Sequence, residues 1–224
     1  MKKYKTILFD SDQTLLDFTM SERVALFETL SFYNVSPDTG LLETYRRCNR
    51  EAWRLFEQGK MEKCDIVLYR FRKFCEICLL NIDPAEMNDR YLEQLCQTGF
   101  LIDGASDVLR TLFGKYTLYI VTNGIDHVQR SRLKNAGITH FFSDVFTSEE
   151  IGAPKPSRTY FESVFERIPF QKEQALIIGD SLSSDIAGGI GSGIDTCYIN
   201  WDHKTHAEDP TYEVFDLREV LTIL

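Results

Sequence analysis

The pattern of apolar and polar positions changes twice along the chain. A short apolar run at residues 7–9 comes first and stops at acidic residues. Residues 17–99 then carry apolar positions at helical spacing, with no strand-like stretch among them. From residue 100 onward, short apolar runs of strand length alternate with helical segments. This order predicts a sheet whose first strand is separated from the others by an inserted helical module.

The inserted module is expected to contain about four helices, the usual number for a small bundle. Ser21 is a candidate N-cap for the first, whose apolar positions between Val24 and Phe32 fit one broad face. Further helices are expected over residues 41–58, over 62–80, and from Asp83-Pro84 to about Cys96.

The remainder of the chain predicts an α/β fold, a doubly wound parallel sheet with right-handed crossovers. The expected strands are 6–9, 116–121, 144–146, 175–178 and a last one at 196–199; the expected helices are 104–114, 126–136, 158–167 and 183–190. Residues 1–16 and 100–224 would form this core, and residues 17–99 the helical insertion.

Composition restricts the kinds of partner. The 224 residues carry 25 basic and 34 acidic side chains, a net charge of −9, and no basic cluster typical of nucleic-acid binding. No apolar run is long enough for a membrane span or a signal peptide. The six cysteines are scattered, which favours free thiols. We therefore expect a cytoplasmic protein that binds neither nucleic-acid polymers nor membranes.

Polar side chains follow three of the expected strands. Asp10 and Asp12 come directly after the first strand, and residues two apart in an extended chain point to the same side. Thr122 and Asn123 follow a second strand, and Asp180 follows a third. The carboxyl ends of parallel strands share one edge, where open α/β sheets bind ligands. A cation is expected beside the two neighbouring carboxylates, because like charges repel.

Two further residues can join this group. Lys155 lies between Pro154 and Pro156, which keep the backbone out of a regular helix, so Lys155 is a candidate cation for the site. Asp185 lies five residues beyond Asp180, in the first turn of the following helix, where the helix dipole also favours an acid.

Taken together, these residues resemble the four ordered motifs of the haloacid dehalogenase-like hydrolase superfamily. The motifs are Asp10-x-Asp12-x-Thr14, Thr122, Lys155-Pro156 and Gly179-Asp180-x-x-x-x-Asp185. The helical insertion resembles the small α-helical cap of that superfamily. The stretches 121–124, 148–152 and 179–181 are similar to its nucleoside 5′-monophosphatase branch, which includes pyrimidine 5′-nucleotidases. One departure is Gln13, where many members carry glycine, and a stiffer loop beside the site is expected there.

The resemblance implies a Mg²⁺-dependent phosphomonoesterase that works through an aspartyl-phosphate. Asp10 would be the nucleophile. Asp12 would protonate the leaving alkoxide and later deprotonate water. Lys155 would balance the phosphate charge and orient Asp10. The Thr122 hydroxyl and the Asn123 backbone N–H would donate to the phosphoryl oxygens.

The resemblance also implies a metal site and a substrate class. Asp10, the backbone carbonyl of Asp12, and Asp180 would bind Mg²⁺, and Asp185 would orient these groups rather than bind the ion. The substrate would be a small phosphorylated metabolite, and the nucleotidase branch implies a nucleoside 5′-monophosphate. Phe18, just beyond the first motif, is a candidate to stack on the nucleobase.

Other functions remain open at this point. A phosphoglycolate or sugar phosphatase would use the same core residues, and so would a phosphomutase. A retired phosphate-binding regulatory module is the non-enzymatic alternative, although every expected catalytic group is present. A dehalogenase would need neither the metal nor an acid at position 12.

Overall fold

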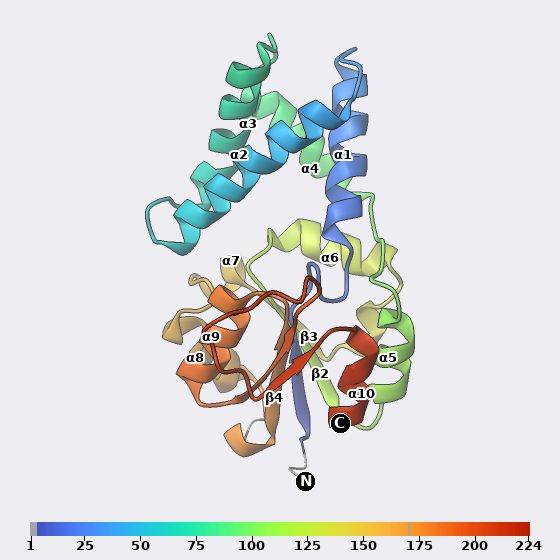
Figure 1. Ribbon diagram of the computed structural model, residues 1–224, viewed down its shortest axis with the longest axis vertical. Coiled ribbons are helices and arrows are strands. Elements are labelled where there is room, and N and C mark those ends of the chain that lie inside the picture. Colours follow the sequence, from blue (N-terminus) through green and yellow to red (C-terminus); the bar gives the residue numbers. More distant parts are fainter. Residues whose placement is uncertain (1–3, 170) are drawn as a thin grey trace. The chain divides into compact units, whose positions relative to one another are not determined.

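The computed structural model describes residues 4–169 and 171–224 and divides the chain into two compact units (Figure 1). Residues up to Phe18 together with Gly99–Leu224 form one, the core unit, and Thr19–Thr98 form the other, the helical unit. In the described part of the chain, no helix combines the length and the apolar character that crossing a membrane requires.

The core unit is built on a sheet of six parallel strands in the order β3-β2-β1-β4-β5-β6. The strands are β1 Thr6–Phe9, β2 Thr117–Thr122, β3 Asp144–Thr147, β4 Ala175–Gly179, β5 Asp195–Ile199 and β6 Tyr212–Val214. The predicted α/β parallel sheet is confirmed. The expectation that the strand near 196–199 is the last was wrong, because β6 follows it. Only one of the three β6 residues is buried, so β6 has no apolar run to reveal it.

Helices cover both faces of this sheet. In Figure 1, α8 and α9 lie on one side of the strands and α5 and α10 on the other. Within β1, Ile7 and Phe9 pack into one apolar cluster and Leu8 into another, which explains why residues 7–9 are all apolar. The helices are α5 Ala105–Leu112, α6 Asp126–Asn135, α7 Ser148–Ile151, α8 Arg158–Arg167, α9 Ala187–Ser192 and α10 Val220–Ile223.

The segment after β4 differs from the single helix expected at 183–190. It begins as a wide π-helical turn, Leu182–Ile186, and continues as α9. The Ser181 hydroxyl accepts a hydrogen bond from the Ser184 N–H at 3.2 Å and so begins the turn. This turn holds Asp185 fully buried beside the sheet edge.

The helical unit contains the expected four helices, α1 Phe18–Phe32, α2 Thr39–Glu57, α3 Lys63–Cys78 and α4 Pro84–Cys96. The Asp38 side chain caps α2 and the Asp83 side chain caps α4. The start expected for α1 was wrong: the helix begins at Phe18, whose N–H donates to the Gln13 side chain at 2.8 Å. Ser21 is therefore a buried residue inside the helix and not its cap.

The buried face of α1 matches the expected apolar face in part, since Leu26 and Leu30 are buried as predicted. Phe32 is 57% exposed, whereas Glu22 is buried. Glu22 can be buried because Arg46 donates to one of its oxygens at 2.8 Å and Asn49 to the other at 3.2 Å. The buried Arg70 extends this network by donating to Asn49 at 3.1 Å. Polar partners therefore add Glu22 to a buried side of α1 that also carries the apolar Leu26 and Leu30.

Candidate active site

The sheet register brings three of the predicted side chains to one edge. Phe9 pairs with Ile120 of β2 and with Ile178 of β4, so Asp10 lies one residue short of the level of Thr122 and Asp180. Asp10 continues the ladder by donating its N–H to the Ile178 carbonyl at 2.9 Å. Thr122 and Asp180 follow on the neighbouring strands, as expected for ligand-binding groups of an open α/β sheet.

Lys155 lies at the centre of the site and is 1% exposed. Its Nζ donates to Asp10 Oδ1 at 2.7 Å, to Asp185 Oδ1 at 2.6 Å and to the Val121 carbonyl at 2.8 Å. Burial opposes the charged form, but the two carboxylates outweigh burial and raise the pKa of Lys155 above its usual range. All three ammonium hydrogens are thus used, and Lys155 acts as a fixed positive charge that holds Asp10 and Asp185.

The predicted loop around Lys155 is held by Asn123. The Asn123 side chain donates to the Lys155 carbonyl at 3.0 Å and accepts from the Lys155 N–H at 2.8 Å. The sequence reading assigned only the backbone N–H of Asn123 and missed this pair of bonds. Beside it, the buried Thr122 hydroxyl oxygen accepts from the Gly124 N–H at 3.0 Å, which fixes the hydroxyl at the sheet edge.

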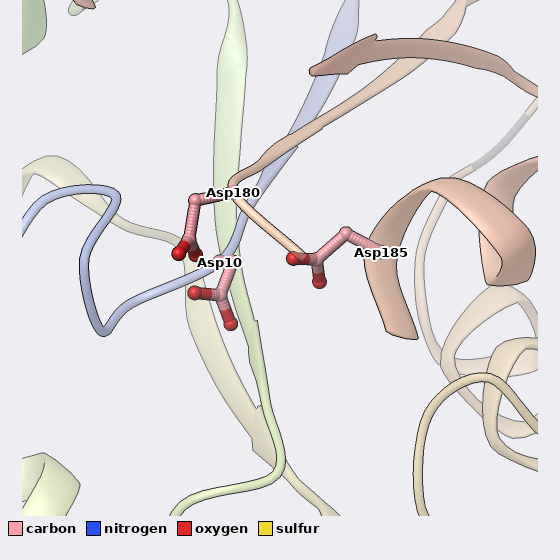
Figure 2. A group of neighbouring side chains, drawn as sticks. All are labelled: Asp10, Asp180 and Asp185. Carbon is pink, nitrogen blue, oxygen red and sulfur yellow. The ribbon is translucent and has the colours of Figure 1, made fainter. Parts of the chain in front are cut away.

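Three carboxylates meet next to Lys155, and Figure 2 shows them turned toward one another. One ligand oxygen from each of Asp10, Asp180 and Asp185 lies within 4.8 Å of the others. Burial, opposed by the Lys155 charge, raises the pKa of Asp10 to about 7. Burial, together with the charges of Asp10 and Asp185, raises the pKa of Asp180 well above its usual range. This excess of negative charge is the environment that a hard divalent cation neutralises.

The three acids differ in how their oxygens are used. Asp185 accepts one hydrogen bond on each oxygen, Oδ1 from Lys155 and Oδ2 from the Ser181 N–H at 3.1 Å. Asp180 makes a long contact of 3.4 Å with the Thr14 hydroxyl. Gly179 allows the close approach of Asp185, since a Cβ at this position would lie 2.3 Å from Asp185 Oδ2.

Asp12 lies apart from this cluster and is held by α6. Gln129 donates to Asp12 Oδ2 at 2.6 Å, and Arg132 forms an ion pair with Asp12 Oδ1. Sequence reasoning missed both Gln129 and Arg132. The available signal was their spacing of three residues on the helix that follows the Thr122 strand, where two buried polar side chains share one face.

Gln13 adopts a left-handed backbone with φ of +58°, a conformation that glycine takes easily. Its carbonyl accepts from the Trp201 indole N–H at 2.7 Å, and its side chain caps α1. The glutamine thus keeps a glycine-like turn and adds a bond that ties this loop to the first turn of α1.

Comparison with known proteins places this arrangement in a family. The sequence matches the family model of the haloacid dehalogenase-like hydrolases over residues 7–199. The chain belongs to this hydrolase family. The resemblance predicted from the motifs is therefore confirmed.

Relatives match the chain over nearly its full length. The HAD-hydrolase YfnB of Bacillus subtilis is 42% identical, with 100% of this chain and 97% of the relative covered. Its crystal structure, bound to magnesium and described as revealing interdomain movement, has a TM-score of 0.94 and covers 99% of both chains. The pyrimidine 5′-nucleotidase PynA of Streptococcus pneumoniae is 37% identical over 99% of this chain and 95% of its own length. The pyrimidine 5′-nucleotidase YjjG of Escherichia coli is 29% identical over 99% and 98%. The prediction of a phosphatase agrees with the names of the two nucleotidases.

Proposed function

We propose that this hydrolase is a Mg²⁺-dependent phosphomonoesterase that acts on nucleoside 5′-monophosphates through an aspartyl-phosphate on Asp10. The observation that carries the proposal is the buried ion-pair group at the sheet edge. Lys155 fixes one oxygen of Asp10 at 2.7 Å, and the carboxylate of Asp180 lies beside it. A nucleophilic carboxylate held next to an excess of negative charge suits phosphoryl transfer with a divalent cation.

The acid cluster fits a magnesium ion. Side-chain oxygens of Asp10 and Asp180, with the backbone carbonyl of Asp12, would hold it, because Mg²⁺ takes oxygen ligands. Asp185, which accepts from Lys155 and from the Ser181 N–H, would hold these groups in place rather than bind the ion. When bound, the ion would neutralise the carboxylates and stabilise the negative charge of the transferring phosphoryl group. Magnesium in the related YfnB structure supports this assignment.

The reaction would proceed in two displacements. An oxygen of Asp10 forms a bond to phosphorus while the ester P–O bond breaks, and Asp12 gives its proton to the leaving oxygen, which departs as an alcohol. Asp12 then takes a proton from water, whose oxygen bonds to phosphorus and releases inorganic phosphate from Asp10. The Thr122 hydroxyl and the Asn123 N–H would donate to the phosphoryl oxygens. Lys155 would act as a positioning residue that orients Asp10.

The substrate class rests on the relatives. Two pyrimidine 5′-nucleotidases match at 37% and 29% identity over nearly the whole chain. The helical unit Thr19–Thr98 would serve as the cap that selects the leaving group and excludes water during transfer. The interdomain movement described for YfnB supports a mobile cap.

The test is phosphate release from a panel of nucleoside 5′-monophosphates, sugar phosphates and small-acid phosphates. Each substrate is assayed with Mg²⁺ and with chelator, beside the variant Asp10→Asn. We expect release that requires Mg²⁺, is strongest on a pyrimidine nucleoside monophosphate and is lost in Asp10→Asn. Phosphorylated protein trapped by rapid acid quench and located at Asp10 by mass spectrometry would support the intermediate.

Other results would change the proposal in defined ways. Highest activity on a sugar or small-acid phosphate would keep the chemistry and reject the nucleotide class. Conversion of one phosphate ester into its isomer would indicate a phosphomutase. Full activity in Asp10→Asn would reject the aspartyl-phosphate mechanism.

A further inference from the structure

Two side chains on one face of α6 bind both oxygens of the Asp12 carboxylate. Arg132 pairs with Oδ1, and Gln129 donates to Oδ2 at 2.6 Å. Arg132 is fully buried and Gln129 is 2% exposed, so both side chains are packed inside the core unit. With one donor on each oxygen, the carboxylate is held in a single orientation.

Neighbouring residues hold Gln129 and Arg132 in place. The buried Ser11 hydroxyl donates to Gln129 Oε1 at 2.7 Å, which orients the amide so that its NH₂ faces Asp12. Gly124 leaves the space for this amide, because a Cβ there would lie 2.2 Å from Gln129 Nε2. The Arg132 Cζ lies 5.4 Å from the centre of the Phe18 ring, within the range of a cation–π contact.

We propose that Gln129 and Arg132 are positioning residues that aim Asp12 at the leaving oxygen. This inference rests on the proposed phosphomonoesterase function. A general acid must lie within hydrogen-bond reach of the atom that it protonates, and misplacing it by about 1 Å can cost about 10²-fold in rate. Each Asp12 oxygen has a second lone pair, so the contacts with Gln129 and Arg132 leave a position for the transferred proton.

The nature of the leaving group separates positioning from a merely structural role. A nucleoside alkoxide needs the Asp12 proton as its P–O bond breaks, whereas para-nitrophenolate leaves without one. The value of kcat/KM covers the steps up to release of the leaving group. Removing the contact of Gln129 or Arg132 with Asp12 should therefore lower kcat/KM for a nucleoside 5′-monophosphate far more than for para-nitrophenyl phosphate.

The experiment compares Gln129→Met and Arg132→Lys with the wild type on both substrates in Mg²⁺. General-acid catalysis contributes about 10²–10⁴-fold, so we expect a loss of about tenfold or more on the nucleotide and less than about threefold on the aryl phosphate. In an Asp12→Asn background the same changes should alter either rate by no more than about twofold, because the residue they act through is gone.

A second variant and a matched control guard against misfolding and nonspecific effects. Gln129→Met leaves the Arg132–Asp12 ion pair in place, so this variant is expected to fold even where Arg132→Lys does not. Circular dichroism checks both. The matched control is Arg130→Met, which changes an exposed arginine of the same helix that pairs with Asp126 and Glu150. It should leave the substrate ratio unchanged.

Equal losses on the two substrates, or losses that persist undiminished in Asp12→Asn, would overturn the positioning role while leaving the phosphatase proposal intact. If the wild type releases no phosphate from either substrate, the proposed function is wrong and the positioning role is rejected with it.

Discussion

Replacing Lys155 with methionine tests the central ion-pair group of the site. The substitution keeps most of the apolar side chain but removes the ammonium, which lies 2.7 Å from Asp10 and 2.6 Å from Asp185. Both carboxylates stay buried without this counter-charge. Removing one partner of a buried ion pair costs about 3–5 kcal/mol.

Because Lys155 has two carboxylate partners, we expect Lys155→Met to lower the free energy of unfolding by about 4–5 kcal/mol, near the upper end of that range. Such a loss is large beside the roughly 5–15 kcal/mol that stabilises a typical domain. Adding Asp185→Asn should restore part of it, because one of the two unpaired carboxylates is then removed.

Urea titration followed by tryptophan fluorescence measures this loss in the core unit alone. The chain has two tryptophans, Trp53 in the helical unit and Trp201 in the core unit. In a Trp53→Phe background the remaining signal comes from the core unit. Chelator is present throughout, so that no divalent cation replaces the lost positive charge.

The control is Arg158→Met, which removes a cation from an exposed pair with Glu162 in the same unit. Its urea curve should overlay that of the reference protein. A loss below about 1 kcal/mol for Lys155→Met would refute the reasoning, because it would mean that Lys155 does not compensate the buried carboxylates. Strictly additive losses in the double variant with Asp185→Asn would refute it too.

Three further outcomes are expected. Gly179→Ala should lower kcat by about tenfold or more by displacing the carboxylate that lies against it, whereas Gly191→Ala, with nothing within 4 Å of its Cβ, should leave steady-state rates unchanged. Phe18→Ala should raise KM for nucleotides far more than for para-nitrophenyl phosphate; equal effects would exclude stacking on the base. Burial raises the pKa of Cys197 to about 12, so at about pH 8 only about one molecule in 10⁴ carries its thiolate. Iodoacetamide should therefore label the exposed Cys64 in native protein, and Cys197 only in urea or as the pH rises toward 12, as peptide mass spectrometry would show.

Several elements could be predicted from local sequence because local physical chemistry alone defines them. The run Ile7–Phe9 is apolar at every position since both faces of β1 are covered, and it ends at Asp10 where the strand leaves the sheet. Asp83 followed by Pro84 defines the start of α4, because the carboxylate caps the first turn and proline tolerates its first position. The order of strands and helices then leaves few possible topologies.

Partners far apart in the sequence determine two features of the fold that the local pattern does not predict. Glu22 faces the interior of the helical unit because Arg46, 24 residues away, pairs with it, so apolar spacing identified Leu26 and Leu30 on the buried face of α1 but not Glu22. β6 was missed because its place is fixed by pairing with β5 and not by apolar residues of its own.

In the site, too, some features could be predicted from local sequence and others depend on long-range partners. The types and order of Asp10, Lys155 and Asp180 are readable from sequence, because parallel strands bring their carboxyl ends to one edge. Two features of the site depend on groups that lie between 30 and 145 residues apart in the chain. One is that all three ammonium hydrogens of Lys155 are used inside the protein. The other is that α6 holds both oxygens of Asp12. The sequence alone determined which chemical groups this protein carries to the sheet edge. Only tertiary packing decided which of them are fixed in place, because a hydrogen bond needs a partner at the right distance and angle.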